Sequence, residues 1–172
     1  METLGSIDNP WPLVPTDSAI NGAKGLIMDL RAPISINSIL DAARDAVRSD
    51  TRTDADALLS QVRIIFAVFE YLNRPSFVQR FQFVIEDVNT QLGYIEQVTG
   101  QPYLRNWWRA FINDFLYQIA LWARTWADDA INIAGAPFVE ASNNGRRLTQ
   151  YNTVINALRA LQARIDNDLA FK

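Results

Sequence analysis

One stretch of the chain, residues 104–133, constrains the fold more than any other. Bulky apolar side chains recur in it at steps of three and four residues, which is the periodicity of an α-helix. They cover more of the helix circumference than one buried face needs, so the helix is expected to be buried on several sides. The sequence therefore predicts a central, enclosed helix built on Trp107, Trp108, Phe111, Ile112, Phe115, Leu116, Ile119, Trp122 and Trp126.

The composition limits the chemistry that is open to the chain. Its 172 residues suit one domain, and 49% of them are hydrophobic, which is typical of a globular protein. No cysteine and no histidine is present, so disulfides, thiolate chemistry and imidazole bases are excluded. A net charge of −3 and a pI near 4.9 give no strong signal for nucleic-acid binding. Fourteen of the sixteen basic residues are arginine, which we interpret mainly as helix-surface ion pairing.

No part of the sequence predicts a membrane span or a signal peptide. The longest apolar run, Ile64 to Phe69, is far shorter than the ~20 residues that cross a bilayer. The N-terminus lacks a basic region followed by an apolar one. A protein from which a leader had been removed would look the same, so secretion stays open and the localisation is not predicted.

Residues 1–35 are expected to form an irregular N-terminal arm, and residues 36–172 a helical bundle domain. Prolines and glycines punctuate the arm, with at most a helical turn around Ile27 to Leu30. Its apolar side chains are too many for a free tail, so we expect the arm to lie across the bundle. These residues are Trp11, Leu13, Val14 and Ile20.

The helix-start and helix-stop signals in the rest of the chain predict an all-α fold. It is an antiparallel bundle of about five helices around the central Trp-rich helix. Short connections between long helices favour antiparallel neighbours. Capping residues and Gly or Pro signals set the expected ends. The expected helices run from Ser35 or Asn37 to Val47, from a Thr53–Asp56 capping box to Asn73, from Ser76 to Thr99, from Leu104 to Gly135-Ala136-Pro137, and from a Thr149 cap to Leu169. A further helical turn or two is expected through Phe138 to Ala141, before a turn at Asn143-Asn144-Gly145.

Asp128 and Asp129 are the only candidate for metal chemistry that the sequence offers. Adjacent helical residues point about 100° apart, so the two carboxylates cannot chelate one ion without ligands from a facing helix. Arg124 lies four residues before Asp128, the spacing of an ordinary helix ion pair. We therefore interpret the pair as structural, expect neither cofactor nor catalytic residues, and keep a magnesium-dependent bundle enzyme as an alternative.

Two groups of residues are candidates for binding a partner. Trp107 and Trp108 are adjacent, so either two faces of their helix are covered or one indole is exposed for recognition, with Arg109 beside it. Arg146 and Arg147 precede a helix N-terminus, where guanidinium groups and free N–H groups can hold a phosphate or an acidic partner. Core packing and a solvated turn are the simpler interpretations of the two groups.

One set of residues in the second half of the chain forms a pattern seen in a known family. The set is Trp107-Trp108, Phe111, Asp114, Phe115, Ala123, Trp126-Ala127, Ile131, Pro137-Phe138, Tyr151, Val154, Leu158 and Leu161. With these residues, about a third of the chain resembles the helical accessory region of fungal heat-labile-enterotoxin-like proteins, in which a separate ADP-ribosyltransferase domain is catalytic. The resemblance implies toxin-associated scaffolding or delivery, and no catalytic residue can be carried over because the transferase motifs are missing.

These observations lead to one main hypothesis and three alternatives. The main one is a non-enzymatic helical module that acts through a protein partner or self-association, as part of a secreted toxin-like protein. The alternatives are a helical coat or self-assembly subunit, the magnesium-dependent enzyme, and transient membrane insertion of the Trp-rich helix.

Overall fold

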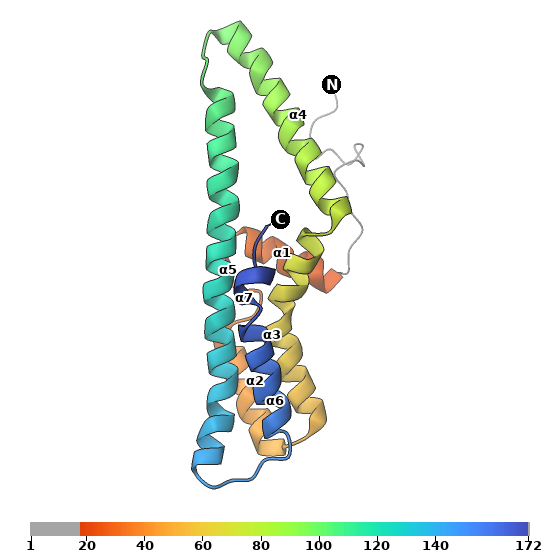
Figure 1. Ribbon diagram of the computed structural model, residues 1–172, viewed down its shortest axis with the longest axis vertical. Helices are drawn as coiled ribbons and strands as arrows, with labels where there is room; N and C mark the ends of the chain where they lie inside the picture. Colours follow the sequence, from red (N-terminus) through yellow and green to blue (C-terminus); the bar gives the residue numbers. More distant parts are fainter. Residues whose placement is uncertain (1–17, 172) are drawn as a thin grey trace.

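The computed structural model describes residues 18–171, which form seven α-helices and no β-strand (Figure 1). The predicted all-α class is therefore confirmed. In chain order the helices are α1 (Ser18–Met28), α2 (Ile36–Ser49), α3 (Arg52–Leu72), α4 (Pro75–Thr99), α5 (Leu104–Asn143), α6 (Tyr151–Gln162) and α7 (Ile165–Asp168).

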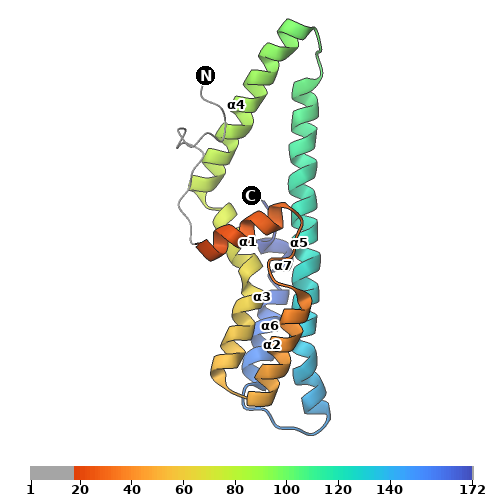
Figure 2. The ribbon, with the colours of Figure 1, turned by 180° about the vertical axis from the view of Figure 1, so that it is seen from behind.

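Helix α5 runs along the whole length of the molecule and belongs to two parts of it (Figures 1 and 2). Its C-terminal half packs with α1, α2, α3, α6 and α7 in a compact part that we call the body. Its N-terminal half, residues 104–121, pairs with α4 in a projecting arm that we call the hairpin. Figure 1 shows the two hairpin helices meeting at the tip and diverging toward the body.

The hydrophobic core lies in the body. The large side chains that are almost completely buried come from the body and from Ile119, where α5 passes from the hairpin into the body, because there several helices cover the same apolar stripe. The largest of these side chains are Tyr71, Phe69, Phe138, Ile27, Ile39, Leu58, Leu59, Ile65, Leu72, Ile119 and Leu169.

The prediction of an enclosed Trp-rich helix is confirmed for one half of α5 and wrong for the other. Ile119 and Trp126 are buried among neighbouring helices, and Trp122 packs against the same core. Trp107 and Phe111 are exposed, because α4 is the only helix beside the first turns of α5. The width of the apolar sector of α5 therefore predicted burial correctly only in the half of the helix that other helices of the body surround.

The predicted irregular arm contains a helix in its described part. Residues 18–28 form α1, where an irregular segment with one helical turn was expected. Gly22 and Gly25 weaken a helix, but burial of Ala23 and Ile27 against the body offsets that loss. The expectations for Trp11 and the first three prolines concern residues 1–17, which lie outside the described residues.

The helix starts follow local capping, with one correction. Ser35 caps α2 as predicted, accepting a hydrogen bond from the Ser38 N–H at 3.1 Å. The cap of α3 is Thr51 with Asp54, two residues before the predicted pair; the Asp54 N–H donates to Thr51 Oγ1 at 3.3 Å. Thr51 and Thr53 are each followed three residues later by an Asp, so the capping-box spacing alone could not show which threonine is the cap.

The predicted helix ends are right for α3 and α4 and wrong for α5. Helix α4 ends at Gly100, which adopts the left-handed conformation (φ +70°) of a C-terminal cap. Helix α5 continues through Gly135 and Pro137 to Asn143, where the predicted turn follows. The predicted last helix is divided into α6 and α7 by a turn at residues 163–164.

Candidate functional site

Exposed apolar side chains gather on the hairpin. Among the described residues, nine of the eleven large hydrophobic side chains that face solvent lie between positions 83 and 121. A concentration of exposed apolar residues on one part of a protein marks an interaction site more often than scattered exposed residues do. The nine are Phe83, Tyr94, Ile95, Val98, Tyr103, Trp107, Phe111, Tyr117 and Leu121.

The hairpin exposes these residues because two helices cannot enclose a core. Helix α4 buries only Asn89 and Glu96 fully, and none of its apolar side chains. A pair of helices can cover one stripe on each helix, whereas the apolar sectors of α4 and α5 are wider than one stripe. The surplus apolar surface therefore faces solvent. Within residues 18–171, no helix is long and apolar enough to cross a membrane.

Trp107 and Trp108 have different surroundings, which answers the question that their adjacency raised. The Trp108 indole is half-buried and donates from Nε1 to the Ile85 carbonyl oxygen of α4 at 3.3 Å. The Trp107 indole is 66% exposed and stacks on Tyr103, with ring centroids 6.3 Å apart. Trp108 therefore joins the two helices, and Trp107 is available to a partner.

The aromatic rings form a continuous ladder along α5. Trp108 stacks on Phe111 with ring centroids 5.9 Å apart, and Phe111 stacks on Phe115 at 5.8 Å. Stacked rings restrict one another's rotamers, so this surface is ordered before a partner arrives. Ordering in advance lowers the entropic cost of binding.

One side of the hairpin is polar. Near the tip, Glu96 accepts hydrogen bonds from the Arg105 backbone N–H at 3.0 Å and from Arg105 Nε at 2.6 Å. The backbone hydrogen bond, followed by the guanidinium, lowers the pKa of the Glu96 carboxyl below its ordinary value. The Arg105 side chain also lies over Gly93, where a Cβ would be 3.6 Å from Arg105 Cδ, an ordinary van der Waals distance. This ion pair fastens α4 to α5 beside the tip.

Helical geometry places four of the exposed apolar residues away from this polar side. Successive residues turn by about 100° around a helix axis. With the polar side fixed by Gly93 and Arg105, that rotation directs Ile95 and Val98 of α4 and Trp107 and Phe111 of α5 toward the other side of the hairpin. We call these four residues the apolar face.

The cleft at the root of the hairpin is the part of the site that sequence reasoning missed. It encloses about 340 Å³ where α4 and α5 diverge. Arg109 and Glu86 stand on opposite walls, so the structure brings Arg109 to this cleft and not to the apolar face. No local pattern indicates a cleft that forms only where helices separate. Its lining is completed by Leu72, Asn73, Phe77, Val78, Phe81, Gln82, Ile85, Ile112, Asn113, Leu116 and Phe171.

One of the protein's own carboxylates lies close to the predicted anion site at Arg146 and Arg147, which stays a prediction. The Asp50 carboxylate accepts hydrogen bonds from the Thr149 N–H at 2.8 Å and the Gln150 N–H at 3.1 Å. These hydrogen bonds, that of Thr149 foremost, lower the pKa of Asp50. The predicted Thr149 cap is wrong, because the N-cap position of α6 is Gln150.

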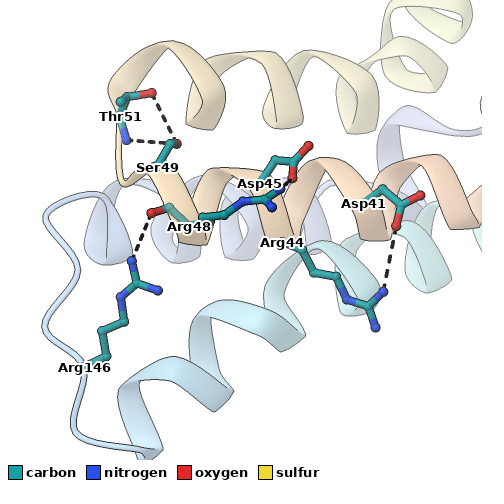
Figure 3. A network of polar contacts seen from close by, with 7 residues as sticks. All are labelled: Asp41, Arg44, Asp45, Arg48, Ser49, Thr51 and Arg146. Carbon is teal, nitrogen blue, oxygen red and sulfur yellow. Dashed lines mark hydrogen bonds and ion pairs between the residues drawn. The ribbon is translucent and has the colours of Figure 1, made fainter.

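Arg146 has a structural partner, and Arg147 is an exposed loop residue. Arg146 Nη2 donates to the Arg48 carbonyl oxygen at 3.1 Å, so the loop after α5 is held against the end of α2 (Figure 3). In the same view, Arg48 pairs with Asp45 on α2, as expected for helix-surface ion pairs. The loop between α5 and α6, which contains both arginines, lies on the body at the opposite end of the molecule from the tip where α4 and α5 meet (Figure 1).

Asp128 and Asp129 do not form a metal site with other acids. The Asp128 carboxylate accepts from Gln162 Nε2 at 2.6 Å and from Asn132 Nδ2 at 3.2 Å, and Asp129 is exposed. No group of three potential acidic ligands comes together within the described range. The predicted pair between Arg124 and Asp128 is also wrong. Arg124 Nε donates instead to the Leu169 carbonyl oxygen at 3.0 Å.

Comparisons with protein-family models, with curated protein sequences and with solved structures give no match to this chain.

Proposed function

We propose that this protein is a non-enzymatic helical interaction module that binds its partner through the apolar face of the hairpin. The observation that carries the proposal is the concentration of exposed aromatic and aliphatic side chains on a projecting arm. Tryptophan and tyrosine are enriched at protein interfaces, where a large rigid ring contributes much contact area. Trp107 and Phe111 are the residues expected to contribute most to binding.

The two cavities that α5 lines most carry one acid each, Glu86 in the cleft of the hairpin and Glu140 in the larger groove between α5 and α6, about 830 Å³. Acid–base chemistry on two carboxylates needs both in one site. A third cleft does carry two acids, Glu70 and Asp168, and Asp168 is paired there with Arg164. Membership of a toxin-like protein stays a prediction, because neither the fold nor the comparisons test it.

The proposal is tested by single charge substitutions on the arm and on the body. Trp107→Glu and Phe111→Glu place a carboxylate on the apolar face, and Val139→Glu makes the same change at an exposed apolar residue of α5 outside the hairpin. Each immobilised variant is exposed to extract from cells of the source organism, and retained proteins are quantified by mass spectrometry. We expect wild type and Val139→Glu to retain the same partner, and the two hairpin variants to lose at least about tenfold of it.

Circular dichroism establishes that all four proteins are folded before the comparison is made. Equal retention by all four would show that binding does not use the apolar face. A wild-type protein that retains nothing, forms no oligomer and binds no vesicle would remove the proposal altogether.

A further inference from the structure

We infer that the partner of the apolar face is a second copy of this chain, so that two hairpins form an intermolecular four-helix bundle. This inference rests on the proposed function and names its partner. Two antiparallel helices with one apolar side are half of a four-helix bundle. A second copy supplies the other half, with the same length and the same residues, through a two-fold interface in which the same patch faces itself.

The exposed area is sufficient for such a pair. The side chains of Ile95, Val98, Trp107 and Phe111 are between 46% and 87% exposed. With the edge of Tyr103 they present roughly 600 Å² per copy, on the scale of ~150–250 Å² for one aromatic side chain. Two copies would bury roughly 1,200 Å², which is the lower limit of a standard specific interface. A reversible dimer is therefore expected.

The acids nearest the apolar face are hydrogen-bonded, which lowers the cost of association. Between positions 83 and 121 the chain has four acids and two arginines. Glu96 and Arg105 pair on the polar side. Asp87 and Asp114 each accept from a glutamine one turn later on the same helix, from Gln91 at 2.9 Å and from Gln118 at 3.4 Å. Both carboxylates stay charged, and the dimer therefore has to leave them at its solvated rim.

The same features disfavour a lipid surface as the partner. Exposed apolar residues extend along both helices, from Phe83 to Val98 and from Tyr103 to Leu121, and are not confined to the tip. The Asp114 carboxylate lies among them, and burying a charged group in hydrocarbon is costly. The hairpin has no lysine and one more acid than arginines, so it offers no basic surface to anionic headgroups.

Sedimentation equilibrium over about 1–200 µM tests the inference with the untruncated chain. Wild type and Val139→Glu are expected to approach twice the chain mass of 19.5 kDa as the concentration rises. Trp107→Glu and Phe111→Glu, each shown to be folded by circular dichroism, are expected to weaken the dimer at least about a hundredfold and to stay monomeric. The two hairpin variants serve as independent tests of one surface.

A wild-type monomer at 200 µM overturns the inference, and so does a dimer that both hairpin variants leave unchanged. Vesicles of phosphatidylcholine, with and without phosphatidylserine, then separate the inference from the proposed function. Wild-type monomers that bind vesicles, with binding lost in Trp107→Glu, would replace the second copy by a lipid and keep the apolar face as the interaction site. Monomers that bind neither vesicles nor a retained protein would remove both proposals.

Discussion

At the scale of single residues, side chains that are distant in the sequence close the ends of the helices. Asp50 ends α2 in the left-handed conformation (φ +51°), and its carboxylate accepts hydrogen bonds from the two residues just before α6, about one hundred residues later. Asn73, at the end of α3, donates from Nδ2 to the Ala170 carbonyl oxygen at 2.7 Å. Such polar contacts between elements fix which helix ends meet, because each satisfies a group that its own helix leaves free.

Substitutions of Asp50 are expected to separate its two roles. Asp50→Gly keeps the left-handed backbone and loses the carboxylate, so we expect the free energy of unfolding to fall by about 1 kcal/mol. Asp50→Ala also forces a left-handed conformation on alanine and is expected to cost about 2 kcal/mol. Urea unfolding followed by circular dichroism measures both, with Asp41→Gly, an exposed surface position of α2, as the control for an added glycine. Equal values for the two Asp50 variants would contradict the backbone role.

The stabilisation by Asp50 also predicts a pH dependence. Its folded-state pKa is lowered from the ordinary value of 3.8 by the Thr149 and Gln150 N–H groups. A lowered carboxyl pKa stabilises the fold above the unfolded value, and this contribution is lost as the pH falls through the folded value. The stability difference between wild type and Asp50→Gly is therefore expected to be constant from pH 5 to 7 and to shrink below 3.8. A difference that grew on acidification would exclude this origin.

At the scale of elements, α5 shows packing that overrides local helix breakers. A proline inside a helix removes a hydrogen bond and costs about 3 kcal/mol, and a glycine costs up to ~1 kcal/mol. Yet α5 continues through Gly135 and Pro137, because Ala134 and Phe138 on either side of the proline are completely buried. The burial of this segment offsets the breakers and carries the helix to Asn143.

Gly135→Ala is expected to stabilise the protein by about 0.5–1 kcal/mol, the usual helix-interior difference between the two residues. A Cβ at this position would lie 3.5 Å from Leu158 Cδ1 and 3.8 Å from Ile155 Cδ1, which are ordinary van der Waals distances. The midpoint of thermal unfolding should therefore rise. Gly145→Ala is the matched control, because its φ of +77° makes alanine unfavourable and the midpoint should fall. A lower midpoint for Gly135→Ala would mean that α6 cannot accept the extra methyl group.

At the scale of the whole molecule, the body and the hairpin differ in how well they are stabilised. The body has a continuous core, whereas α4 buries no apolar side chain fully. Regions with few buried apolar contacts open at lower free energy. Amide hydrogen exchange in dilute, monomeric protein is therefore expected to be at least about tenfold faster in α4 than in α3. Equal protection of the two helices would contradict the division into two parts.

The sequence predicted what depends on local pattern, and it missed what depends on the number of neighbours. Periodicity gave the all-α class, and local signals gave the ends of α3 and α4. Trp107 and Trp126 share the same residue type and the same helix, but one is exposed and the other buried because of helices far away in the chain. The hydrogen bonds of Asp50 were missed for the same reason, because its partners Thr149 and Gln150 lie far away in the sequence.

The continuity of α5 gives the molecule a fixed length scale. Forty residues at 1.5 Å each make a rod of about 60 Å, with the aromatic tip at one end and the Asn143 turn at the other. Helix α5 is continuous between the hairpin and the body. A partner bound at the tip therefore also sets the distance and the orientation at which anything attached to the body is held. The helix thus fixes the distance between the tip and the body. A flexible insertion midway along α5 would abolish this fixed distance, even if every contact at the tip were kept.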